Sequence, residues 1–328
     1  MLLSRRALLH RSLLPLLAAI PFRRKSNFAE TVPRSRETHL LFGGDVMMSR
    51  SVGRFARQHG DPALPWRDIA PLFASADIAF VNLEAPFSDR GKLVESGMIF
   101  KAEPDMIDGL QLAGIDIVST ANNHARDCDR YGVGFTLDWL AQHGIAAVGS
   151  AKSAEDAHAG TILERNGTRF GFLAYTYDQS NGNHRDVDDR IAGLDVARMR
   201  EDVASLRTRA DAVIVSMHAG IEYMPRPSRL QEDFAHAAIE AGARVVVGHH
   251  PHVVQPWERA GSGVIFYSLG NLVFDQFQRE ETQHGALALV KFSGATLVDA
   301  RLEHVDILRT GPRLAKEPLT AAARVASG

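Results

Sequence analysis

Five apolar stretches, each ending in residues that bind metals well, constrain the fold of this chain more than any other feature. Their sequences are LLFGGDVM, IAFVNLEAP, DIVSTANNHARD, DAVIVSMHAGIEY and RVVVGHHPHVVQ. Continuous runs of Val, Ile and Leu are typical of parallel strands buried on both faces. Ligands of open α/β sheets bind beyond the carboxyl ends of such strands. Because the runs lead into Asp, Glu, Asn or His, we expect a metal centre at that edge, and with it an enzyme.

The composition is that of a globular protein and argues against some partners. The 328 residues are 45% hydrophobic and 23% charged, and the formal net charge is −2. This balance gives no argument for a nucleic-acid partner or an anionic membrane, and we expect no nucleic acid. Cys128 is the only cysteine, so no intramolecular disulfide can form. A lone thiol is either a metal ligand or nucleophile or, more often, a small apolar core residue.

The first 36 residues form a basic segment, which we exclude from the fold. They contain SRRALL, which is similar to a twin-arginine export signal. The apolar stretch that follows, residues 13–20, is too short to span a bilayer, and Ala29 is the nearest candidate for a cleavage site. We expect export to the periplasm or cell envelope by the twin-arginine route. The alternative is a basic tail, because the second basic cluster at residues 23–25 is unusual for such a signal.

Strand and helix patterns alternate from residue 37 to residue 310 without a linker, so we predict one domain there. Early βαβ alternation followed by hairpins indicates a mixed-sheet α/β sandwich with antiparallel edges. The Asn166-Gly167 pair between two apolar runs predicts a hairpin. Residues 311–328 are Ala/Arg-rich and weakly patterned, and we predict a flexible C-terminal tail. The predicted strands are 39–44, 78–83, 116–120, 146–148, 161–165, 169–174, 212–216, 245–248, 264–268, 285–292 and 300–308.

The first two apolar runs end in a carboxylate. Asp45 follows two glycines, which let the backbone approach a ligand closely, and it either holds a divalent cation or caps the next helix. Glu84 directly follows a buried run and needs a partner, because an unpaired buried charge is costly. That partner is a metal ion or a basic side chain. Asn82 lies two residues earlier on the strand and is expected to point the same way.

The later runs lead into amide and imidazole groups. Asn123 and His124 suit a metal-bound site, or else Asn122-Asn123 forms an Asx turn. His218 is a ligand or a buried core histidine. The strongest local signal is HHPH at residues 249–252, because three imidazoles in four positions repel each other when protonated and a bound cation removes that penalty. Mixed Asp, Glu, Asn and His ligands without thiolate favour one or two ions of Mn, Fe, Zn or Mg.

Six ordered blocks between residues 38 and 277 carry a resemblance to a known family. They are GGDVMMS, VNLEAP, STANNHARD, MHAGIEY, VVVGHHPHVVQ and FYSLGNLVFDQ. In this order they resemble the bacterial capsule-synthesis CapA (PgsA-type, poly-γ-glutamate) family. That family is similar to the calcineurin-like metallophosphoesterases, whose pattern is DxH, GDxxD, GNH, H and GHxH. The resemblance implies a four-layer α/β/β/α sandwich with mixed sheets, the metallo-dependent phosphatase-like fold.

The resemblance also implies roles for individual residues. Glu84 takes the place of the bridging carboxylate, His124 is the proton donor or acceptor, and Glu222 orients His218 or the substrate. Met47 stands where the phosphoesterases have a histidine, so one ligand of the first metal is missing or replaced. The metal ligands implied are Asp45, Glu84, Asn123, His218, His250 and His252. The residues assigned to substrate binding are Asn82, His249, Asn271 and Asp275. Asn271 and Asp275 have an alternative role, in which they cap a turn and pair with an arginine.

Three functions follow as hypotheses. The first is a metal-dependent hydrolase-type enzyme of the cell envelope that acts in the biosynthesis of poly-γ-glutamate or a related capsule polymer, on a polymer or small-molecule substrate. Two metals sharing a carboxylate would clamp the attacking and leaving oxygens during hydrolysis. The second, favoured by Met47, is a non-catalytic accessory subunit whose partners are membrane polymer-synthase subunits. The third is a cytoplasmic metal-dependent phosphoesterase unrelated to capsule.

Overall fold

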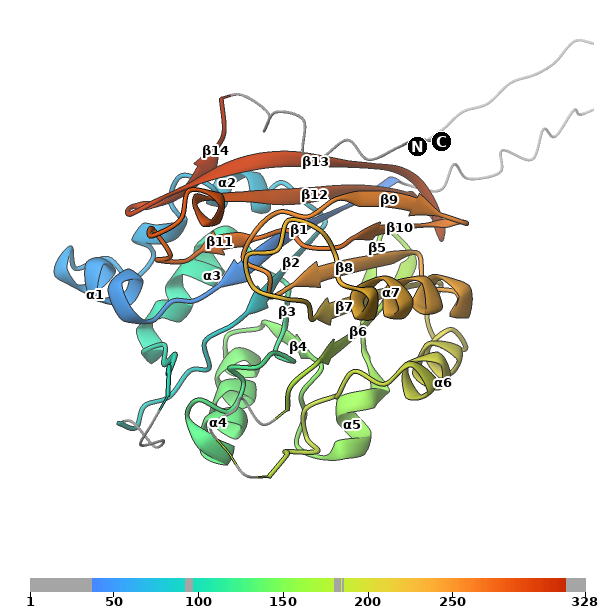
Figure 1. The fold of residues 1–328 in the computed structure, drawn as a ribbon, viewed down its shortest axis with the longest axis horizontal. Helices are drawn as coiled ribbons and strands as arrows, with labels where there is room; N and C mark the ends of the chain where they lie inside the picture. Colours follow the sequence, from blue (N-terminus) through green and yellow to red (C-terminus); the bar gives the residue numbers. More distant parts are fainter. Residues whose placement is uncertain (1–36, 92–96, 180–183, 185, 317–328) are drawn as a thin grey trace, which may run out of the picture. The chain divides into compact units, whose positions relative to one another are not determined.

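The computed structural model describes residues 37–91, 97–179, 184 and 186–316. The predicted export signal and residues 317–328 of the predicted tail lie outside this range. Within it, two mixed β-sheets pack face to face and helices cover their outer faces (Figure 1). The predicted four-layer α/β/β/α arrangement with mixed sheets is therefore confirmed.

The first sheet has eight strands in the order β14-β13-β12-β1-β2-β3-β4, with β11 also pairing with β1. Pairing is parallel from β1 to β4 and antiparallel from β1 through β12 and β13 to β14. Its strands are β1 (Glu37–Val46), β2 (Ile78–Leu83), β3 (Ile117–Ser119), β4 (Ala146–Val148), β11 (Asn271–Val273), β12 (His284–Ser293), β13 (Thr296–Leu308) and β14 (Gly311–Leu314).

The second sheet has six strands in the order β5-β6-β7-β8-β10-β9. The four inner strands are parallel, and the edge strands β5 and β9 are antiparallel to their neighbours. Asn166 and Gly167 both have positive φ, 53° and 78°, at the turn between β5 and β6, which confirms the predicted hairpin. The strands are β5 (Thr161–Arg165), β6 (Thr168–Thr176), β7 (Ala212–His218), β8 (Val245–His249), β9 (Trp257–Ala260) and β10 (Gly263–Phe266).

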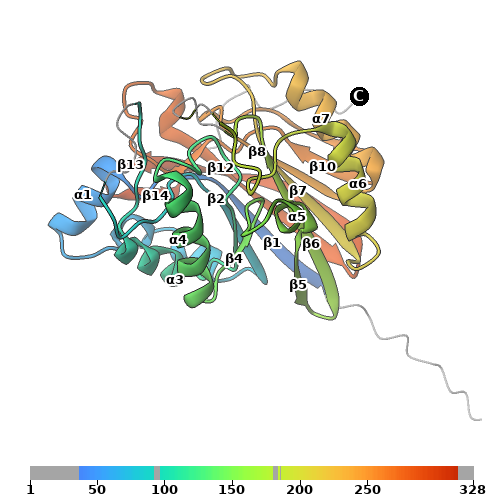
Figure 2. The ribbon, with the colours of Figure 1, turned by 90° about the horizontal axis from the view of Figure 1, so that it is seen from below.

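Alternation along the strands builds three apolar layers. On β1, Leu40 and Phe42 face the second sheet, where they join a core with Phe172 and Val247, whereas Leu41 packs toward the helices of the first sheet. Figure 2 shows α3 and α4 on one side of the paired sheets and α6 and α7 on the other. The helices are α1 (Arg50–Gln58), α2 (Ala70–Phe73), α3 (Ile107–Ala113), α4 (Asp129–Gln142), α5 (Ala154–Ala159), α6 (Val196–Leu206) and α7 (Arg229–Ala241), with short 3-10 turns at Leu64–Trp66, Pro104–Met106 and Glu281–Gln283.

The predicted domain end at residue 310 is wrong by one strand. Residues 311–314 form β14, which pairs antiparallel with β13 at the sheet edge, so this part of the predicted tail belongs to the fold. Pro312 obscured the strand in the sequence, because proline lacks an N–H donor and is tolerated only at sheet edges.

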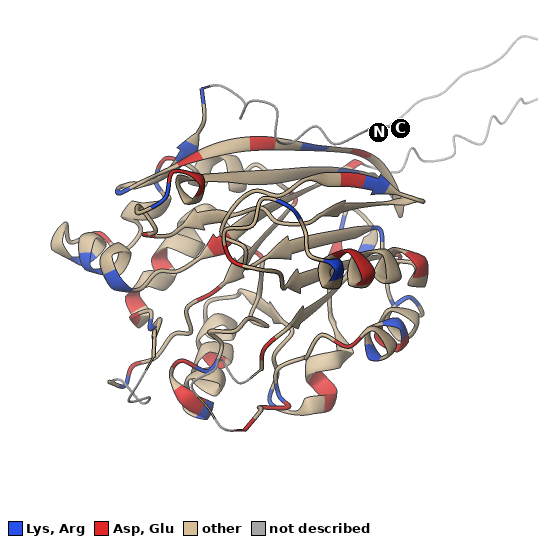
Figure 3. Cartoon of the chain, viewed as in Figure 1, with Lys and Arg blue, Asp and Glu red and all other residues tan. Residues whose placement is uncertain are grey.

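Acidic and basic residues are interspersed on α6 and α7 (Figure 3). Among the described residues, no helix combines the length and apolarity that a membrane crossing needs.

Candidate metal centre

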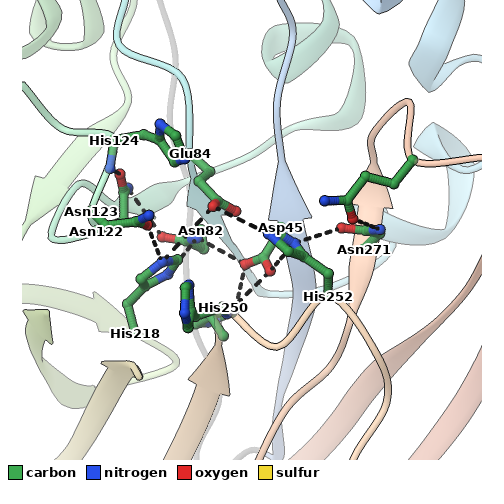
Figure 4. A network of polar contacts seen from close by, with 12 residues as sticks. Asp45, Asn82, Glu84, Asn122, Asn123, His124, His218, His250, His252 and Asn271 are labelled. Carbon is green, nitrogen blue, oxygen red and sulfur yellow. Dashed lines mark hydrogen bonds and ion pairs between the residues drawn. The ribbon is translucent and has the colours of Figure 1, made fainter. Parts of the chain in front are cut away.

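The strand ends named in the sequence meet at one edge of the two sheets. Asp45 ends the straight part of β1, Glu84 follows β2, and His218 and His249 end the paired strands β7 and β8. Because parallel strands point the same way, their carboxyl ends deliver these side chains to one place (Figure 4). The turn after β8 adds His250 and His252.

Two groups of ligand atoms share Glu84. One group is Glu84, His250 and His252, and the other is Asp45, Glu84 and His218. In each group, one ligand atom from every residue lies within 4.8 Å of the others, and all the side chains are buried. The arrangement therefore offers two adjacent positions for a cation with one carboxylate between them.

Glu84 is a buried carboxylate that accepts no hydrogen bond from the residues described. Both its oxygens lack a partner among the described residues, and Oε1 lies 3.9 Å from Nε2 of His218 and 3.8 Å from Nε2 of His252. Burial raises the pKa of Glu84 well above its ordinary value, and the neighbouring charge of Asp45 adds to the rise. Because an unpaired buried carboxylate is costly, this residue favours a bound cation.

The pKa of Asp45 is shifted in the direction opposite to that of Glu84. Asn82 Nδ2 donates to its Oδ1 at 2.8 Å, and the backbone N–H of His250 donates to its Oδ2 at 3.2 Å. Burial acts to raise the pKa of Asp45, but contacts with His249 and His252 outweigh it and hold the pKa well below the ordinary value. Two like charges in one buried site move their pKa values apart in this way. Asp45 is therefore an ionised and oriented candidate ligand.

His218 is held by two asparagines. Its Nε2 lies 2.7 Å from Asn123 Oδ1, and its Nδ1 lies 3.2 Å from Asn82 Nδ2. Burial, followed by the charge of neighbouring imidazoles, lowers the pKa of His218 well below its ordinary value, which keeps the ring neutral as a ligand must be. The predicted role of Glu222 in orienting His218 is not observed, because both ring nitrogens face asparagines and Glu222 is exposed on the loop after β7.

The two histidines of the turn after β8 have unusual backbone conformations. The φ angles of His250 and His252 are 97° and 59°, in the left-handed region that non-glycine residues rarely adopt. The segment is thus a strained turn. His252 Nδ1 lies 3.0 Å from Asn271 Oδ1, which directs its Nε2 toward Glu84. Burial lowers the pKa of His250 to about 3, so this imidazole is neutral at physiological pH.

His124 lies beside the ligands and is paired with an aspartate that the sequence analysis missed. Its Nδ1 is 2.7 Å from Asp127 Oδ2, and its ring stacks on Phe100 at 3.8 Å between centroids. The N–H of Phe100 donates to the same Asp127 oxygen at 2.5 Å. An aspartate three residues after the histidine, in NNHARD, was the available signal. The contacts orient the imidazole and leave Nε2 to exchange a proton.

The residues assigned to substrate binding have other contacts. Asn82, His249 and Asn271 are fully buried, and they contact Asp45, His218 or His252 rather than an open space. Asn82 and Asn271 therefore orient candidate ligands by hydrogen bonds, whereas His249 has no side-chain hydrogen bond among the described residues. Substrate binding by these three residues stays a prediction. The fourth assigned residue takes the alternative given for it: the Asp275 carboxylate pairs with Arg50 and accepts the backbone N–H of Ser51 at 3.0 Å, in the first turn of α1.

Met47 is turned away from the centre. The pairing of β1 with β11 shifts register between Asp45 and Val46, and a shift of this kind breaks the alternation that would place residues 45 and 47 on one face. Met47 is fully buried in the apolar layer beneath the helices, and its Sδ accepts the N–H of Ser49 at 3.3 Å.

Cys128 is also fully buried, and burial raises the pKa of its thiol to about 12, so it is a core residue rather than a nucleophile.

A divalent ion suits these residues. The donors are carboxylate, amide and imidazole groups, which bind Mn, Fe, Zn or Mg. Several of the buried polar atoms have no hydrogen-bond partner among the described residues, and a bound cation would give the Glu84 oxygens a partner. Near the centre these atoms are Oε1 and Oε2 of Glu84, Nδ1 and Nε2 of His249, and Nδ1 of His250. The His249 Nδ1 atom lies 3.4 Å from Asp45 Oδ1, in an ion-pair contact without hydrogen-bond alignment.

Two curated relatives match most of the folded part of the chain. The PGA biosynthesis protein CapA of Bacillus subtilis (strain 168) is 31% identical over 239 residues, which are 72% of this chain and 63% of that protein. The capsule biosynthesis protein CapA of Bacillus anthracis is 29% identical over 247 residues, which are 71% of this chain and 59% of that protein. The chain thus spans less than two thirds of the length of these relatives.

A solved structure supports the fold. A hypothetical protein from Thermus thermophilus superposes with a TM-score of 0.52 at 17% identity, over 85% of this chain and 100% of that one. In the sequence, the family model described as bacterial capsule synthesis protein PGA_cap matches residues 39–276. That match covers all the candidate ligands and the strands from β2 to β11, and the chain belongs to this bacterial capsule synthesis family, as its six sequence blocks predicted.

Proposed function

We propose that this protein is a metal-dependent, hydrolase-type enzyme of the cell envelope that acts in the biosynthesis of poly-γ-glutamate or a related capsule polymer. The observation that carries the proposal is Glu84, a fully buried carboxylate that has no hydrogen bond within the part of the chain that the structure describes and that belongs to two groups of candidate ligands. A purely structural carboxylate at this depth would have a basic or N–H partner. The names of the relatives support the polymer, since they are proteins of PGA or capsule biosynthesis.

The residues of the centre divide the work of hydrolysis. Asp45, Glu84, Asn123, His218, His250 and His252 would hold one or two divalent ions, which when bound supply Lewis acidity toward the scissile bond. Asn82 and Asn271 fix the orientation of their ligand neighbours by hydrogen bonds. His124, oriented by Asp127, gives or takes a proton at Nε2 as the bond breaks.

Location and partners are part of the proposal. The SRRALL sequence near the N-terminus supports export by the twin-arginine route to the periplasm or envelope, where a capsule polymer is assembled. The substrate is a polymer or small molecule with a γ-glutamyl amide or a phosphate ester bond, and membrane synthase subunits are the proposed partners. Detection of the chain in the cytoplasm alone would favour the phosphoesterase hypothesis unrelated to capsule.

A second candidate function rests on Met47. Because this side chain is packed in the apolar layer, the phosphoesterase pattern lacks one ligand. We keep a non-catalytic accessory subunit of a membrane polymer synthase as the alternative. In that case the protein would bind metal without turnover and would be recovered with membrane synthase subunits.

Metal analysis of purified protein, with variants at the centre, tests the proposal. Wild type is expected to bind Mn²⁺ or Zn²⁺ stoichiometrically, and Glu84→Gln and His250→Ala to lose it while the far-UV circular dichroism stays unchanged. The matched control is Glu201→Gln, an exposed position on α6. Turnover of a panel of γ-glutamyl oligomers and phosphate esters is then measured with and without chelator. Chelator-sensitive turnover supports the enzyme, and its absence supports the non-catalytic accessory subunit. Stoichiometric metal in both centre variants would refute the metal site.

A further inference from the structure

Arg50 lies next to the candidate metal centre, separated from two of its imidazoles by single aromatic rings. Its guanidinium carbon is 4.8 Å from the centroid of the Phe100 ring and 5.9 Å from that of Phe274. The Phe100 ring stacks on His124, and the Phe274 ring lies 4.8 Å from that of His252. A cation held over two aromatic rings is oriented without losing all its hydrogen-bond donors.

The local structure does not favour an arginine at this position. Arg50 is the first residue of α1 and has a φ of 46°, in the left-handed region that costs a non-glycine residue free energy. A positive charge at a helix N-terminus is also unfavourable, because the helix dipole places partial positive charge there. Residues strained in this way cluster at functional sites, where other interactions hold them.

The contacts of Arg50 leave room for a ligand. Among the described residues, its guanidinium pairs with Asp275 through Nη2, and Nη1 contacts the Sδ atom of Met98 at 3.5 Å. A thioether is a weak acceptor, and a guanidinium has five N–H donors. The side chain of Arg50 is 32% exposed, whereas that of Asp275 is 5% exposed. The guanidinium is thus anchored through Nη2, while the Arg50 side chain as a whole remains partly exposed.

Resting on the metal-dependent function proposed above, we propose that Arg50 binds an oxyanion group of the substrate, a phosphate or a carboxylate, beside the metal centre. The buried carboxylates of Asp45 and Glu84 would repel an anionic substrate, and the charge of Arg50 counters them. The planar guanidinium also matches the geometry of phosphate and carboxylate oxygens better than an ammonium group does.

Calorimetric titration of the full-length, Mn²⁺-loaded protein tests this inference with two probes, inorganic phosphate and glutarate. Whichever probe wild type binds identifies the source of the oxyanion. Arg50→Gln is expected to weaken that binding by about tenfold or more, as for the loss of a hydrogen bond to a charged group. Arg50→Lys keeps the positive charge but loses the planar, two-pronged guanidinium. Its affinity for the anion is expected to lie between those of wild type and Arg50→Gln. The matched control Arg54→Gln, exposed one turn later on α1, is expected to bind as wild type does.

Separate outcomes bear on the inference and on the proposed function. The inference is overturned if Arg50→Gln binds both Mn²⁺ and the anion with the affinities of wild type. It is also overturned if Mn²⁺-loaded wild type binds neither probe. Both results leave the proposed metal centre intact. Wild type that fails to bind Mn²⁺ would instead overturn the proposed function. If circular dichroism shows that Arg50→Gln does not fold, the comparison of Arg50→Lys with wild type decides, with unchanged affinity counting against the inference.

Discussion

Oε1 of Glu84 lies 3.8 Å from Nε2 of His252, and neither oxygen of this carboxylate has a hydrogen bond among the described residues. This separation exceeds the range of a hydrogen bond. It is close to the spacing of two atoms that each lie about 2.0–2.2 Å from one ion. The same oxygen is 3.9 Å from Nε2 of His218. The position of Glu84 therefore suits metal binding. In the absence of an ion, the same position lowers the stability of the folded protein.

Replacing Glu84 with glutamine should separate these two effects. Without metal, Glu84→Gln is expected to be as stable as wild type or more stable. The amide cannot ionise, whereas burial makes ionisation of the Glu84 carboxyl costly and raises its pKa. With Mn²⁺ at about 100 times the dissociation constant, wild type should gain about 2.7 kcal/mol and the variant nothing. Differential scanning calorimetry with and without Mn²⁺ measures both. A variant destabilised without metal yet still stabilised by Mn²⁺ would contradict this account.

Restoring the histidine of the phosphoesterase pattern should not restore a ligand. Met47→His would place an imidazole in the apolar layer beneath the helices, where it would cost about 1–3 kcal/mol for lack of a partner. Met47→Leu conserves the volume and should cost less than about 1.5 kcal/mol. Urea denaturation and metal analysis check both variants. An additional equivalent of metal bound by Met47→His would show that the register shift at Asp45 does not prevent ligation.

The fold was largely predictable because buried parallel strands leave continuous apolar runs. The bounds of β2, β4 and β5 were predicted to the residue. The strands β9, β11 and β14 and the helix α5 were missed. Each is short, and sequences such as WERA and GPRL show no apolar run, since edge strands bury only part of their surface.

The centre was predictable for its ligands and much less so for its supporting residues. Every candidate ligand lies at the end of a buried strand or within a few residues after it, which gives a local signal. Whether Asn82 or Asn271 faces substrate or a ligand depends on side-chain direction at the same strand end, and the sequence carries no signal for that. Asp127 lies three residues after His124, a local signal that was not used, whereas only the tertiary structure places Arg50 against Phe100 and Phe274.

Acid should remove the stabilising contribution of Asp275. Burial acts to raise its pKa, but hydrogen bonds from Arg50 and from the N–H of Ser51 hold the pKa below the ordinary value. Since the pKa is lower in the folded state, the contribution is present above the unfolded pKa of about 3.9 and is lost as pH falls through the folded pKa. Asp275→Asn should therefore cost about 1–2 kcal/mol at pH 7, and this difference should shrink below pH of about 4.

Urea denaturation of wild type and Asp275→Asn at a series of pH values measures this difference. Asp68→Asn serves as the control, because Asp68 is exposed. It is expected to change the free energy of unfolding by less than about 0.5 kcal/mol at each pH. A cost for Asp275→Asn that stays constant into acid would show that the carboxylate charge does not provide the stability.

The pairing of His124 with Asp127 should matter for proton transfer and not for metal content. Asp127 Oδ2 lies 2.7 Å from His124 Nδ1 and accepts a hydrogen bond from the Nδ1–H, which leaves Nε2 as the atom that exchanges a proton with substrate. Asp127→Asn is expected to keep its metal, to alter the ¹⁵N shifts of the His124 ring, and to lower turnover of the identified substrate by about 10²-fold or more. Asp129→Asn is the matched control, because Asp129 has a φ of 55° that asparagine also tolerates. Loss of metal in Asp127→Asn, or turnover equal to that of Asp129→Asn, would remove His124 from the proposed proton transfer.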